Sequence, residues 1–537
     1  MPSCARCTAS GIECIFMKSR RGFQGRKKKR LYPDSVNELD TPVDDAGFAN
    51  SVDTDPVFST PSFAIPEGQE ALSEETTSTP HIDVEDPDFD KLINVYYRDI
   101  HPAHPIVLPQ RLYLQNRNIL PEYLRAVMAF MASHLSSVVS DKLQQQAERV
   151  FDPNIPDNGF KVQALLLLTL TSYARFERDR GNKALTEATS LASRIGLDCN
   201  GFGQGQGLIY RESWRRTYWE LYTITGLISL IAGMNFRIRR PDDLLLPGHC
   251  EDYKSGRFGE SRDLRAMRQR VPMEDKFKWS SFAYKIEAMR IMSSIFEGEK
   301  SDGSLSDAQV QAMGASLTGF LFSLPAEKRN PVQDDGDIDE VMSCALMIIN
   351  LAGICLHFPR SSLAGKVSFK TVCGNDRRDK LESQDERFHR AAAIRSANGI
   401  SKLIASRQSL KTLTPCFSCS IAFAAAVHLA AILPRDNSEA QHKEHIQLEL
   451  SALNIVGGIW PIGGVVKSQL AQYTREVLSY RPAPAVLPSS SDHILSALPL
   501  QGEPWLDDLT SQYIDIPSEG FLFDLMSQPV DSTNRTT

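Results

Sequence analysis

Apolar residues recur with the spacing of an α-helix along most of this 537-residue chain, and no other feature limits its possible folds as strongly. The first apolar face is formed by Phe89, Leu92, Ile93, Tyr96, Tyr97 and Ile100. These positions lie on one side of a helix, which Asp86 or Asp88 could cap. Pro102 and Pro105 would end that helix, because proline cannot continue its hydrogen bonding.

Similar patterns follow until about residue 480, and strand-like alternation is scarce. The expected helices cover 162–176, 184–195, 212–234, 277–297, 305–323, 338–357, 386–407, 416–433, 440–460 and 465–479. The segment 162–176 is apolar nearly all round, as a central helix would be. Gly196 is expected to end the following helix, over 184–195. We therefore predict an all-α body over residues 88–480.

The most apolar segment, Cys416–Leu433, is just long enough to cross a membrane. It contains Ser418, Ser420 and His428, so we expect a buried core helix and no membrane partner. Residues 1–14 lack the apolar core of a signal peptide. We therefore expect a reducing intracellular compartment, in which the cysteines are thiols or metal ligands.

Charge is strongly segregated along the chain. Residues 1–30 carry +8, residues 31–90 carry −16 and residues 481–537 carry −6, which leaves +7 for 91–480 at a net charge of −7. A basic head beside an acidic spacer and an acidic tail indicates a modular nucleic-acid binder.

Two segments have the composition of disordered chain. Residues 34–87 are rich in Asp, Glu, Ser, Thr and Pro, and they hold too few large apolar residues to offset the entropy of ordering. Residues 481–537 alternate acids with bulky apolar residues, as in Trp505–Leu509 and Phe521–Leu525. This pattern is typical of an activation tail that folds onto a coactivator, although a tail that folds back on the body is the alternative.

The head contains Cys4, Cys7 and Cys14 with the spacing C-x2-C-x6-C. Two thiolates three residues apart can hold one tetrahedral zinc ion, and a third can return after a tight turn. Zinc would also supply folding energy that so short a segment lacks. Three cysteines leave one tetrahedral position open, and three unrelated thiols are the alternative interpretation.

Pro2–Cys7 together with Cys14–Phe16 resembles the second half of the fungal binuclear zinc cluster. In that family six cysteines bind two zinc ions, and Cys4, Cys7 and Cys14 match the fourth, fifth and sixth ligands. The resemblance implies that Cys4 bridges the two ions. The first half, which in the family reads CGG-type triplets through a short basic helix, is absent here. We expect either a missing upstream exon or an isoform without this half.

The body resembles the fungal-specific transcription factor homology domain over about residues 90–250. The matching segments are Leu92–Tyr97, His101–Ile106, Val162–Leu166, Ala192–Leu197, Glu212–Tyr222, Arg240–Pro241 and Leu246–Pro247. The resemblance implies an all-α regulatory region that senses an effector or controls activity. From spacing alone, Trp214, Trp219 and Tyr222 are expected core anchors, and Arg215 and Arg216 are expected to pair with acids or to cap a neighbouring helix.

A basic run follows the cysteines, with eight positive charges from Lys18 to Arg30. Such a run contacts phosphates through charge, independently of base sequence. The expected DNA-binding residues are Arg6, Lys18, Arg20, Arg21, Arg26, Lys27, Lys28, Lys29 and Arg30. The block Arg26–Arg30 also reads as a nuclear localisation signal. A solvated charge run is the alternative.

Patterns that would indicate an enzyme are weak. The glycines of Gly201–Gly207 follow no strand and precede no P-loop lysine, so we expect a flexible loop. Cys416 and Cys419 could form a redox pair, but without a thioredoxin-like context two buried thiols are favoured. No Gly-x-Ser-x-Gly or His-Glu-x-x-His motif is present. The expectation is that the protein is not an enzyme.

These observations combine into one hypothesis with five segments. Residues 1–17 form a partial zinc-cluster motif, 18–33 a basic linker, 34–87 an acidic linker, 88–480 the helical regulatory domain and 481–537 an activation tail. The chain would be a nuclear, zinc-dependent, sequence-specific regulator of RNA polymerase II transcription. Its partners would be CGG-type DNA, coactivators and a second copy of itself, although residues 34–88 lack dimerising heptads. The alternative is a truncated family member that binds partners or an effector without reading DNA.

Overall fold

The structure is a computed structural model that describes residues 87–136, 138, 141–231, 238–269, 276–302, 305–363, 383–432 and 439–479. All of them belong to one structural unit, Pro80–Thr537. Within these residues every named element is a helix, and β-structure is limited to two isolated bridges, Leu245–Asp263 and Val332–Ile338. The predicted all-α fold is therefore confirmed.

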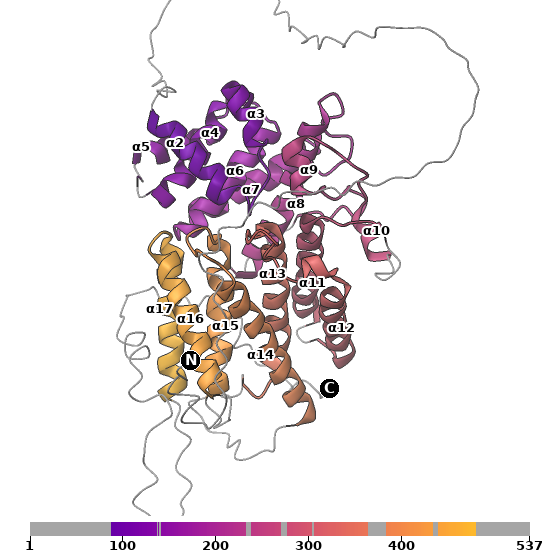
Figure 1. The fold of residues 1–537 in the computed structure, drawn as a ribbon, viewed down its shortest axis with the longest axis vertical. Coiled ribbons are helices and arrows are strands. Elements are labelled where there is room, and N and C mark those ends of the chain that lie inside the picture. The colour runs from indigo at the N-terminus through magenta and orange to yellow at the C-terminus, as the bar shows by residue number, and fades with distance from the viewer. Residues whose placement is uncertain are drawn as a thin grey trace, which may run out of the picture. The chain divides into compact units, whose positions relative to one another are not determined.

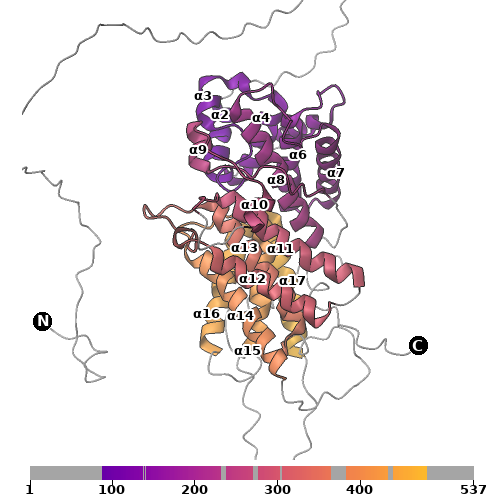
Figure 2. The ribbon, with the colours of Figure 1, turned by 90° about the vertical axis from the view of Figure 1, so that its right-hand side faces the viewer.

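The N-terminal helices lie together in the upper part of Figures 1 and 2. They are α2 (Pro87–Val95), η1 (Tyr96–Ile100), α3 (Gln110–Gln115), η2 (Arg117–Ile119), α4 (Glu122–Ser133), η3 (His134–Ser136), α5 (Asp141–Glu148), η4 (Arg149–Phe151), α6 (Gly159–Ala174), α7 (Arg178–Arg194) and α9 (Cys250–Ser255). The six apolar residues predicted to share the first helical face are all buried. That helix continues as a π-helical turn, η1, before Pro102.

Helices α6 and α7 confirm the predicted pair over 162–195. The side chain of Asn158 accepts a hydrogen bond from the Lys161 amide and so caps α6, whose residues are buried nearly throughout. In α7 the expected face is buried, except that Ile195 lies half-buried after the last turn. Gly196 has φ +72°, the left-handed conformation that glycine adopts most readily at a helix end.

The remaining helices continue through α8 (Leu208–Ile231) into the lower part of Figures 1 and 2. They are α10 (Leu264–Gln269), α11 (Ser281–Asp302), α12 (Asp307–Ser323), η5 (Ala326–Lys328), α13 (Glu340–His357), η6 (Phe358–Arg360), α14 (Gln384–Ala405), η8 (Pro415–Phe417), α15 (Ser418–Ile432), α16 (Glu439–Gly457) and α17 (Pro461–Ser479). Consecutive members from α13 to α17 pack against each other, and α8 contacts α6, α7 and α11. Helix α8 therefore joins the two groups.

Two helical segments, Glu340–Arg360 and Pro415–Ile432, are long and apolar enough to cross a membrane. Both are mostly buried inside the body, where their apolar side chains contact other helices. The prediction that the second segment is a core helix is confirmed. The first segment passes the same test although its sequence was not singled out.

The turn between α16 and α17 requires glycine. A Cβ atom added at Gly463 would lie 2.5 Å from the backbone nitrogen of Gly457, a distance that real side chains do not reach. The paired glycines around Trp460 and Pro461 thus let two helix ends approach closely. This confirms the predicted break between two late helices.

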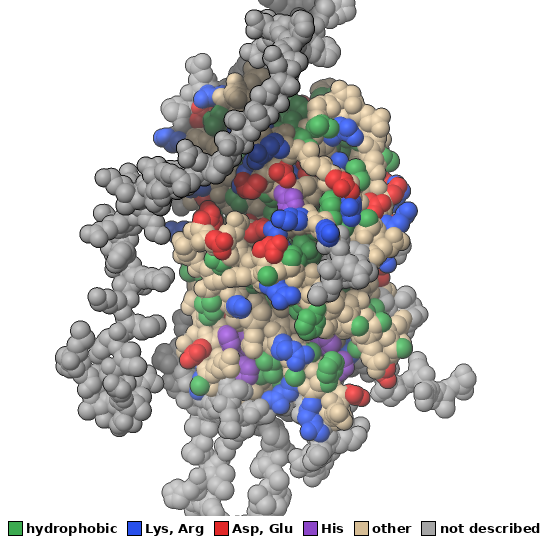
Figure 3. All heavy atoms as spheres, turned by 45° about the vertical axis from the view of Figure 1, so that its right-hand side comes forward, with side chains coloured by type: hydrophobic (Ala, Val, Ile, Leu, Met, Phe, Trp, Pro, Cys, Tyr) green, Lys and Arg blue, Asp and Glu red, His purple; other side chains and the backbone are tan. Residues whose placement is uncertain are grey.

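On the face of the body drawn in Figure 3, basic and acidic side chains are interspersed and hydrophobic side chains occur in small groups. The most exposed large hydrophobic side chains include Leu114, Phe322 and Phe388, which come from three different helices. That face therefore shows no broad single-sign patch of the kind that nucleic acid requires.

Candidate functional site in the helical body

All predicted zinc and DNA contacts lie outside the described residues. This applies to Cys4, Cys7 and Cys14, to Arg6, and to the basic residues from Lys18 to Arg30. The acidic linker and the acidic-aromatic tail lie outside them as well. Within the part of the chain that the structure describes, no group of three or more His, Cys, Asp or Glu side chains is arranged to hold a metal ion.

Helix α8 carries a buried polar seam, and it is the first unusual feature of the body. The seam consists of Glu212, Ser213, Arg216, Thr217 and Glu220, which are at most 2% exposed. Their spacing puts them on one side of the helix, which elsewhere would face water. Because a buried polar group without a partner is destabilising, each member needs a partner inside the fold.

Apolar side chains of the same helix hold the seam in place. Trp214, Trp219 and Tyr222 are buried, which confirms them as core anchors. The indole nitrogen of Trp219 donates a hydrogen bond to the Leu245 carbonyl over 3.0 Å. Helix α8 is therefore fixed on both its apolar and its polar side.

Glu212 and Arg216 form the first half of the seam. Arg216 Nε donates to Glu212 Oε1 over 2.8 Å, and its Nη2 donates to the Gly248 carbonyl over 2.8 Å. The guanidinium also lies 4.3 Å from the ring centroid of Tyr253. Arg215 Nη1 contacts the other oxygen of Glu212 at 2.8 Å. The prediction that both arginines pair with acids is confirmed.

Glu220 forms the second half, with Lys285 of α11. The ammonium nitrogen of Lys285 lies 2.8 Å from both carboxylate oxygens. Burial disfavours both charges, but their mutual attraction prevails, lowering the pKa of Glu220 and raising the pKa of Lys285. The pair is therefore ionised at neutral pH inside the protein.

His104 connects this ion pair to a distant part of the chain. Its Nδ1 lies 2.7 Å from Glu220 Oε1, and its Nε2 lies 2.9 Å from Thr414 Oγ1. The network is satisfied when Nδ1–H donates to the carboxylate and the Thr414 hydroxyl donates to Nε2. His104 is thus a buried link between α8 and the segment before α15.

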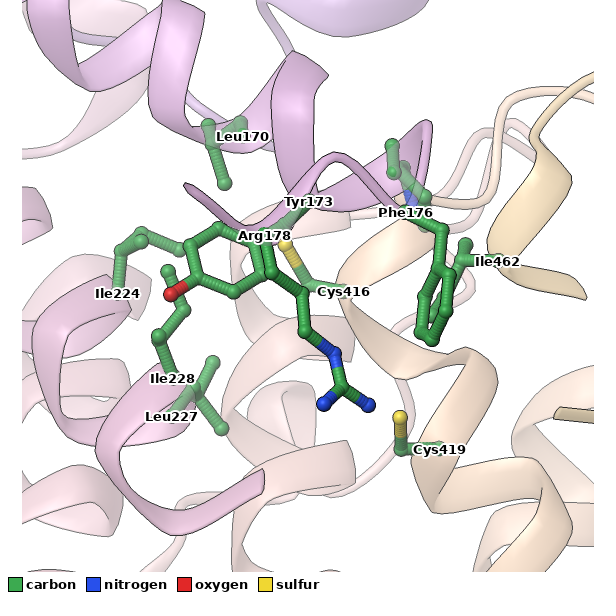
Figure 4. A pocket seen from close by; sticks show the side chains of 12 residues that line it. Leu170, Tyr173, Phe176, Arg178, Ile224, Leu227, Ile228, Cys416, Cys419 and Ile462 are labelled. Atoms are coloured by element: carbon green, nitrogen blue, oxygen red, sulfur yellow. The ribbon is translucent and has the colours of Figure 1, made fainter. Parts of the chain in front are cut away.

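A cavity of about 60 Å³ lies beside this network. Its lining residues come from α6, α7, α8, η8, α15, α17 and the turn after α6 (Figure 4): Leu170, Tyr173, Ala174, Phe176, Arg178, Ile224, Leu227, Ile228, Pro415, Cys416, Cys419 and Ile462. The aliphatic residues from α6 and α8 are buried, and Tyr173, Phe176 and Arg178 are half-buried. The cavity therefore has an apolar floor and a more polar rim.

Phe176 at the rim has an unusual backbone. Its φ is +63°, and the amide of Glu177 donates to the Ser172 carbonyl in the helix-ending turn that normally places glycine at this position. A left-handed conformation costs a residue with a Cβ atom about 1–2 kcal/mol. In this turn the Phe176 ring lies 4.7 Å below the guanidinium of Arg178.

Cys416 and Cys419 line the opposite wall. Burial raises the pKa of Cys416 to about 11 and that of Cys419 to about 12, so both thiols are protonated at neutral pH. The expectation of two buried thiols is confirmed for Cys419, whereas Cys416 is half-buried. The Thr414 hydroxyl and the Lys285 ammonium oppose this rise by lowering the pKa of Cys416. Cys416 is therefore influenced by the ion network and also lines the cavity.

The titratable groups of this region are protonated thiols or partners in hydrogen bonds. The thiols are protonated, and the nearby His104 is fully engaged with Glu220 and Thr414. The predicted loop at Gly201–Gly207 is a series of turns between α7 and α8. None of the cavity's described lining residues pairs a nucleophile with a base.

Sequence reasoning did not identify Arg178, Glu220, Lys285 or Thr414. A signal existed for Lys285, because a lysine among Phe282, Ala283, Tyr284 and Ile286 interrupts an apolar helix face. For Thr414 and Arg178 the local sequence gives no comparable signal.

Comparison with known proteins adds an independent finding. The chain is 25% identical, over an alignment of 544 residues, to the C6 finger domain transcription factor iacK of Pestalotiopsis fici. The alignment covers 89% of this chain and 78% of that protein. No family model matches the chain. No solved structure matches it either. The likeness over most of both chains supports a relationship to the C6 finger transcription factors.

Proposed function

We propose that this protein is a nuclear, zinc-dependent, sequence-specific DNA-binding regulator of RNA polymerase II transcription. The observation that carries the proposal is the likeness to a C6 finger domain transcription factor over 89% of the chain. The spacing of Cys4, Cys7 and Cys14 and the basic run directly after them agree with it. The all-α body between them and the acidic tail would serve as the regulatory part.

In this proposal each segment has its own task. Cys4, Cys7 and Cys14 hold zinc, and Arg6 with the basic residues from Lys18 to Arg30 contacts DNA that carries CGG-type half-sites. The block Arg26–Arg30 directs the protein to the nucleus. The tail from residue 481 recruits coactivators, and a second copy of the chain provides the second DNA contact.

Zinc content tests the first of these tasks. Native mass spectrometry of the full chain, purified with zinc, is compared between the wild type, Cys7→Ser and Cys199→Ser. Cys199 is exposed in the body, so its loss is a matched control for removal of one thiol. We expect the Cys7 variant alone to lose zinc. A Cys7 variant with unchanged zinc content rules out the assigned ligands.

Three thiolates fill three of the four positions that structural zinc occupies, and this observation favours one alternative function. The alternative is a regulatory protein of the same family that binds partners or an effector through its helical body without reading base sequence. A DNA affinity that depends on salt but not on base sequence would support it.

A reporter assay tests the tail. We expect deletion of residues 500–537 to silence a reporter that the full chain activates, at equal protein level. A variant that replaces the same residues with a Gly/Ser segment of equal length separates loss of the acidic-aromatic sequence from loss of length. A reporter that stays active in both variants refutes the assigned activation role.

A further inference from the structure

We propose that residues 503–516 of the acidic tail bind the outer face of α14 in the same chain. This α14 outer face consists of five exposed side chains on one side of the helix: Arg387, Phe388, Ala391, Arg395 and Lys402. The docking itself does not depend on zinc, on DNA or on an activating role of the tail, and its first test needs no transcription assay.

The spacing of these residues defines a continuous surface. They follow one another at intervals of three, four or seven positions, which places them on one side of a helix. On the opposite side Ala393, Ala397 and Ile400 are buried, where α14 packs against α13, α15 and α16. From Arg387 to Lys402 the outer face is about 22 Å long, at 1.5 Å per residue. It therefore offers a tail segment several helical turns of open surface.

Phe388 supplies an apolar contact on this surface. Its side chain is 58% exposed. The ring centroid lies 5.9 Å from that of His357 and 5.4 Å from that of His389, with both pairs edge to face. A single exposed ring is common on protein surfaces, so Phe388 alone does not indicate a partner. The charges on the same face make it specific.

Three cations and no acid lie on the α14 outer face. None of Arg387, Arg395 and Lys402 forms an ion pair with another described residue. Asp385 and Glu386 of the first turn lie outside this side of the helix, and Glu386 accepts a hydrogen bond from the Ser383 amide. The face itself is therefore positive.

The surroundings reduce this charge only in part. Near His389, at the start of α14, lie two acids, Asp307 of α12 and Asp385, and one further cation, Arg360. Together these three contribute one net negative charge beside three positive charges on the face. An anionic ligand is thus favoured over a neutral or cationic one.

Residues 503–516 carry the complementary features. Bulky apolar residues recur there at positions i, i+4, i+8 and i+11 of a helical period: Trp505, Leu509, Tyr513 and Ile516. Acids and no bases accompany them: Glu503, Asp507, Asp508 and Asp515. An amphipathic segment of this kind can lay its apolar side on Phe388 and Ala391 while its acids meet the three cations.

The tail starts at the right end of the body. Helix α17 begins at the cavity that Ile462 lines and therefore ends at the far end of the lower group of helices. Helix α13 begins near the buried Lys285 and ends at His357, beside the start of α14. The end of α17 and the start of α14 thus lie at the same end of this group, its lower end in Figure 1.

The connecting segment is long enough. Helices α15 and α16 each contact both α14 and α17, so two helix spacings of about 8–10 Å separate the latter two. Residues 480–502 have a root-mean-square reach of about 25 Å as flexible chain. Such a tether keeps the segment at roughly millimolar effective concentration, so weak contacts suffice for docking.

Docking has a regulatory consequence, which rests on the activating role proposed for the tail. A bound tail turns its apolar side towards α14, so this side is not available to the groove of a coactivator. The body would then hold activity down until another ligand competes for the tail or for the α14 outer face.

Photocrosslinking in the full chain tests the docking. A p-benzoylphenylalanine replaces Trp505, and mass spectrometry identifies the linked peptides after irradiation. We expect crosslinks within one chain to peptides that cover residues 387–402. The same probe in place of Val530, outside the proposed segment, should give at least about fivefold fewer. Crosslinks between two chains show that a second copy is the occupant and overturn the inference, as do crosslinks only elsewhere or none.

Two phenylalanine variants test the apolar contact. Phe388→Ser is expected to lower the crosslink yield at least about fivefold, because the tail loses the ring on which its apolar side packs. Phe322→Ser is the matched control, since it removes a ring that is 78% exposed on α12, away from the three cations. Both positions are exposed, so both variants should fold. Equal yields in the two variants contradict the assigned surface.

Charge reversal tests the polar contact. The double variant Arg387→Glu with Arg395→Glu is expected to lower the yield, and reversal of Asp507 and Asp508 to arginine in the same chain should restore it. Lys254→Glu with Arg257→Glu reverses two exposed charges near α9 and should change nothing. An unchanged yield in the first variant, or no recovery on compensating reversal, argues against these contacts.

The regulatory consequence has a separate readout. Phe388→Ser should raise the output of a reporter that the full chain activates, at equal protein level, while Phe322→Ser should not. Output that stays constant although the crosslink yield falls overturns the regulatory part and leaves the docking in place. Deletion of residues 500–537 tests the activating role independently, so the two failures are distinguishable.

Discussion

The ammonium nitrogen of Lys285 lies 2.8 Å from each carboxylate oxygen of Glu220, although the two residues belong to different helices and are at most 1% exposed. With His104 and Thr414 this pair joins the segment between η1 and α3, helices α8 and α11, and the residue before η8. The two groups of helices thus share one buried polar centre. Removal of any one of these side chains leaves its charged or polar neighbours buried without that partner and without water in its place.

Removal of either charge of this pair should destabilise the body strongly. We expect Glu220→Gln and Lys285→Met each to lower the free energy of unfolding by about 3–5 kcal/mol, because each leaves an uncompensated buried charge. The double variant should lose less than the sum of the two. Lys254→Met, which breaks an exposed pair with Glu251, serves as the control and should change it by about 0.5 kcal/mol or less. Denaturant unfolding followed by circular dichroism measures all four, and additive losses argue against a coupled pair.

The two neighbouring arginines of α8 should tolerate lysine differently. Arg216 is fully buried, and its guanidinium reaches Glu212 and the Gly248 carbonyl at once. Lysine lacks this forked geometry, so Arg216→Lys is expected to lower the unfolding free energy by about 2–4 kcal/mol. Arg215→Lys keeps a single contact to Glu212 at a more exposed site and should lose about 1 kcal/mol or less. Equal losses in thermal or denaturant unfolding count against the assigned geometry.

The stability of the body should fall as the pH drops below 6.5. Burial lowers the pKa of His134 to about 4, and burial does the same for His101 and His357. Between pH 6.5 and pH 4 these histidines are protonated in the unfolded chain but neutral in the folded chain. Stability that is present above pH 6.5 is therefore lost progressively towards pH 4. Each such histidine lowers the unfolding free energy at pH 5.5 by roughly 1 kcal/mol.

His134 offers the clearest test of this pH dependence. Its Nδ1–H donates to the Phe130 carbonyl and its Nε2 accepts from Arg175, with the ring stacked on Trp460. His134→Gln can keep both hydrogen bonds but cannot titrate. Between pH 6.5 and pH 4 the unfolding free energy should therefore depend less steeply on pH, with one fewer proton taken up on unfolding. An unchanged slope shows that this residue does not titrate as assigned.

The sequence predicts the helices of the fold more completely than it predicts the buried polar centre. The apolar faces of α6, α7 and α13–α17 were predictable because a helical period is a local property, and prolines and Gly196 marked several ends. Helices α3, α4, α5, α9 and α10 were not predicted. With six to eight residues each, α3, α5, α9 and α10 show too few turns for a period to stand out, whereas α4 has twelve residues, of which ten are buried, so that few polar positions mark its period.

The polar centre could not be predicted for a different reason. Glu212, Arg216 and Glu220 form the polar side of an amphipathic helix, and such a side normally faces water. Their burial depends on Lys285 and His104, which are 65 and 116 residues from Glu220, and on Thr414, 310 residues from His104. No local pattern encodes such pairings, which follow from how the helices pack.

The burial of Cys416 and Cys419 makes a chemical prediction. The pKa of Cys199 is raised as well, by desolvation and by Asp198, but its thiol is exposed, so iodoacetamide at pH 7.5 should modify it before Cys416 or Cys419 in the native protein. In denaturant all three should react at similar rates. Mass spectrometry of tryptic peptides follows the reaction. Fast native labelling of Cys416 or Cys419, or a disulfide between them, would favour the redox interpretation instead.

We propose above that this chain reads DNA sequence through a zinc-organised head. The most direct measurement is the affinity of the zinc-loaded full chain for a CGG-containing duplex and for a scrambled duplex of equal length, by fluorescence anisotropy at two salt concentrations. About five phosphate contacts from the basic run give a log–log salt slope near −4.5 on both duplexes. We expect at least about tenfold tighter binding to the CGG duplex, as base contacts require. Equal affinity for both duplexes contradicts it and leaves the sequence-indifferent alternative.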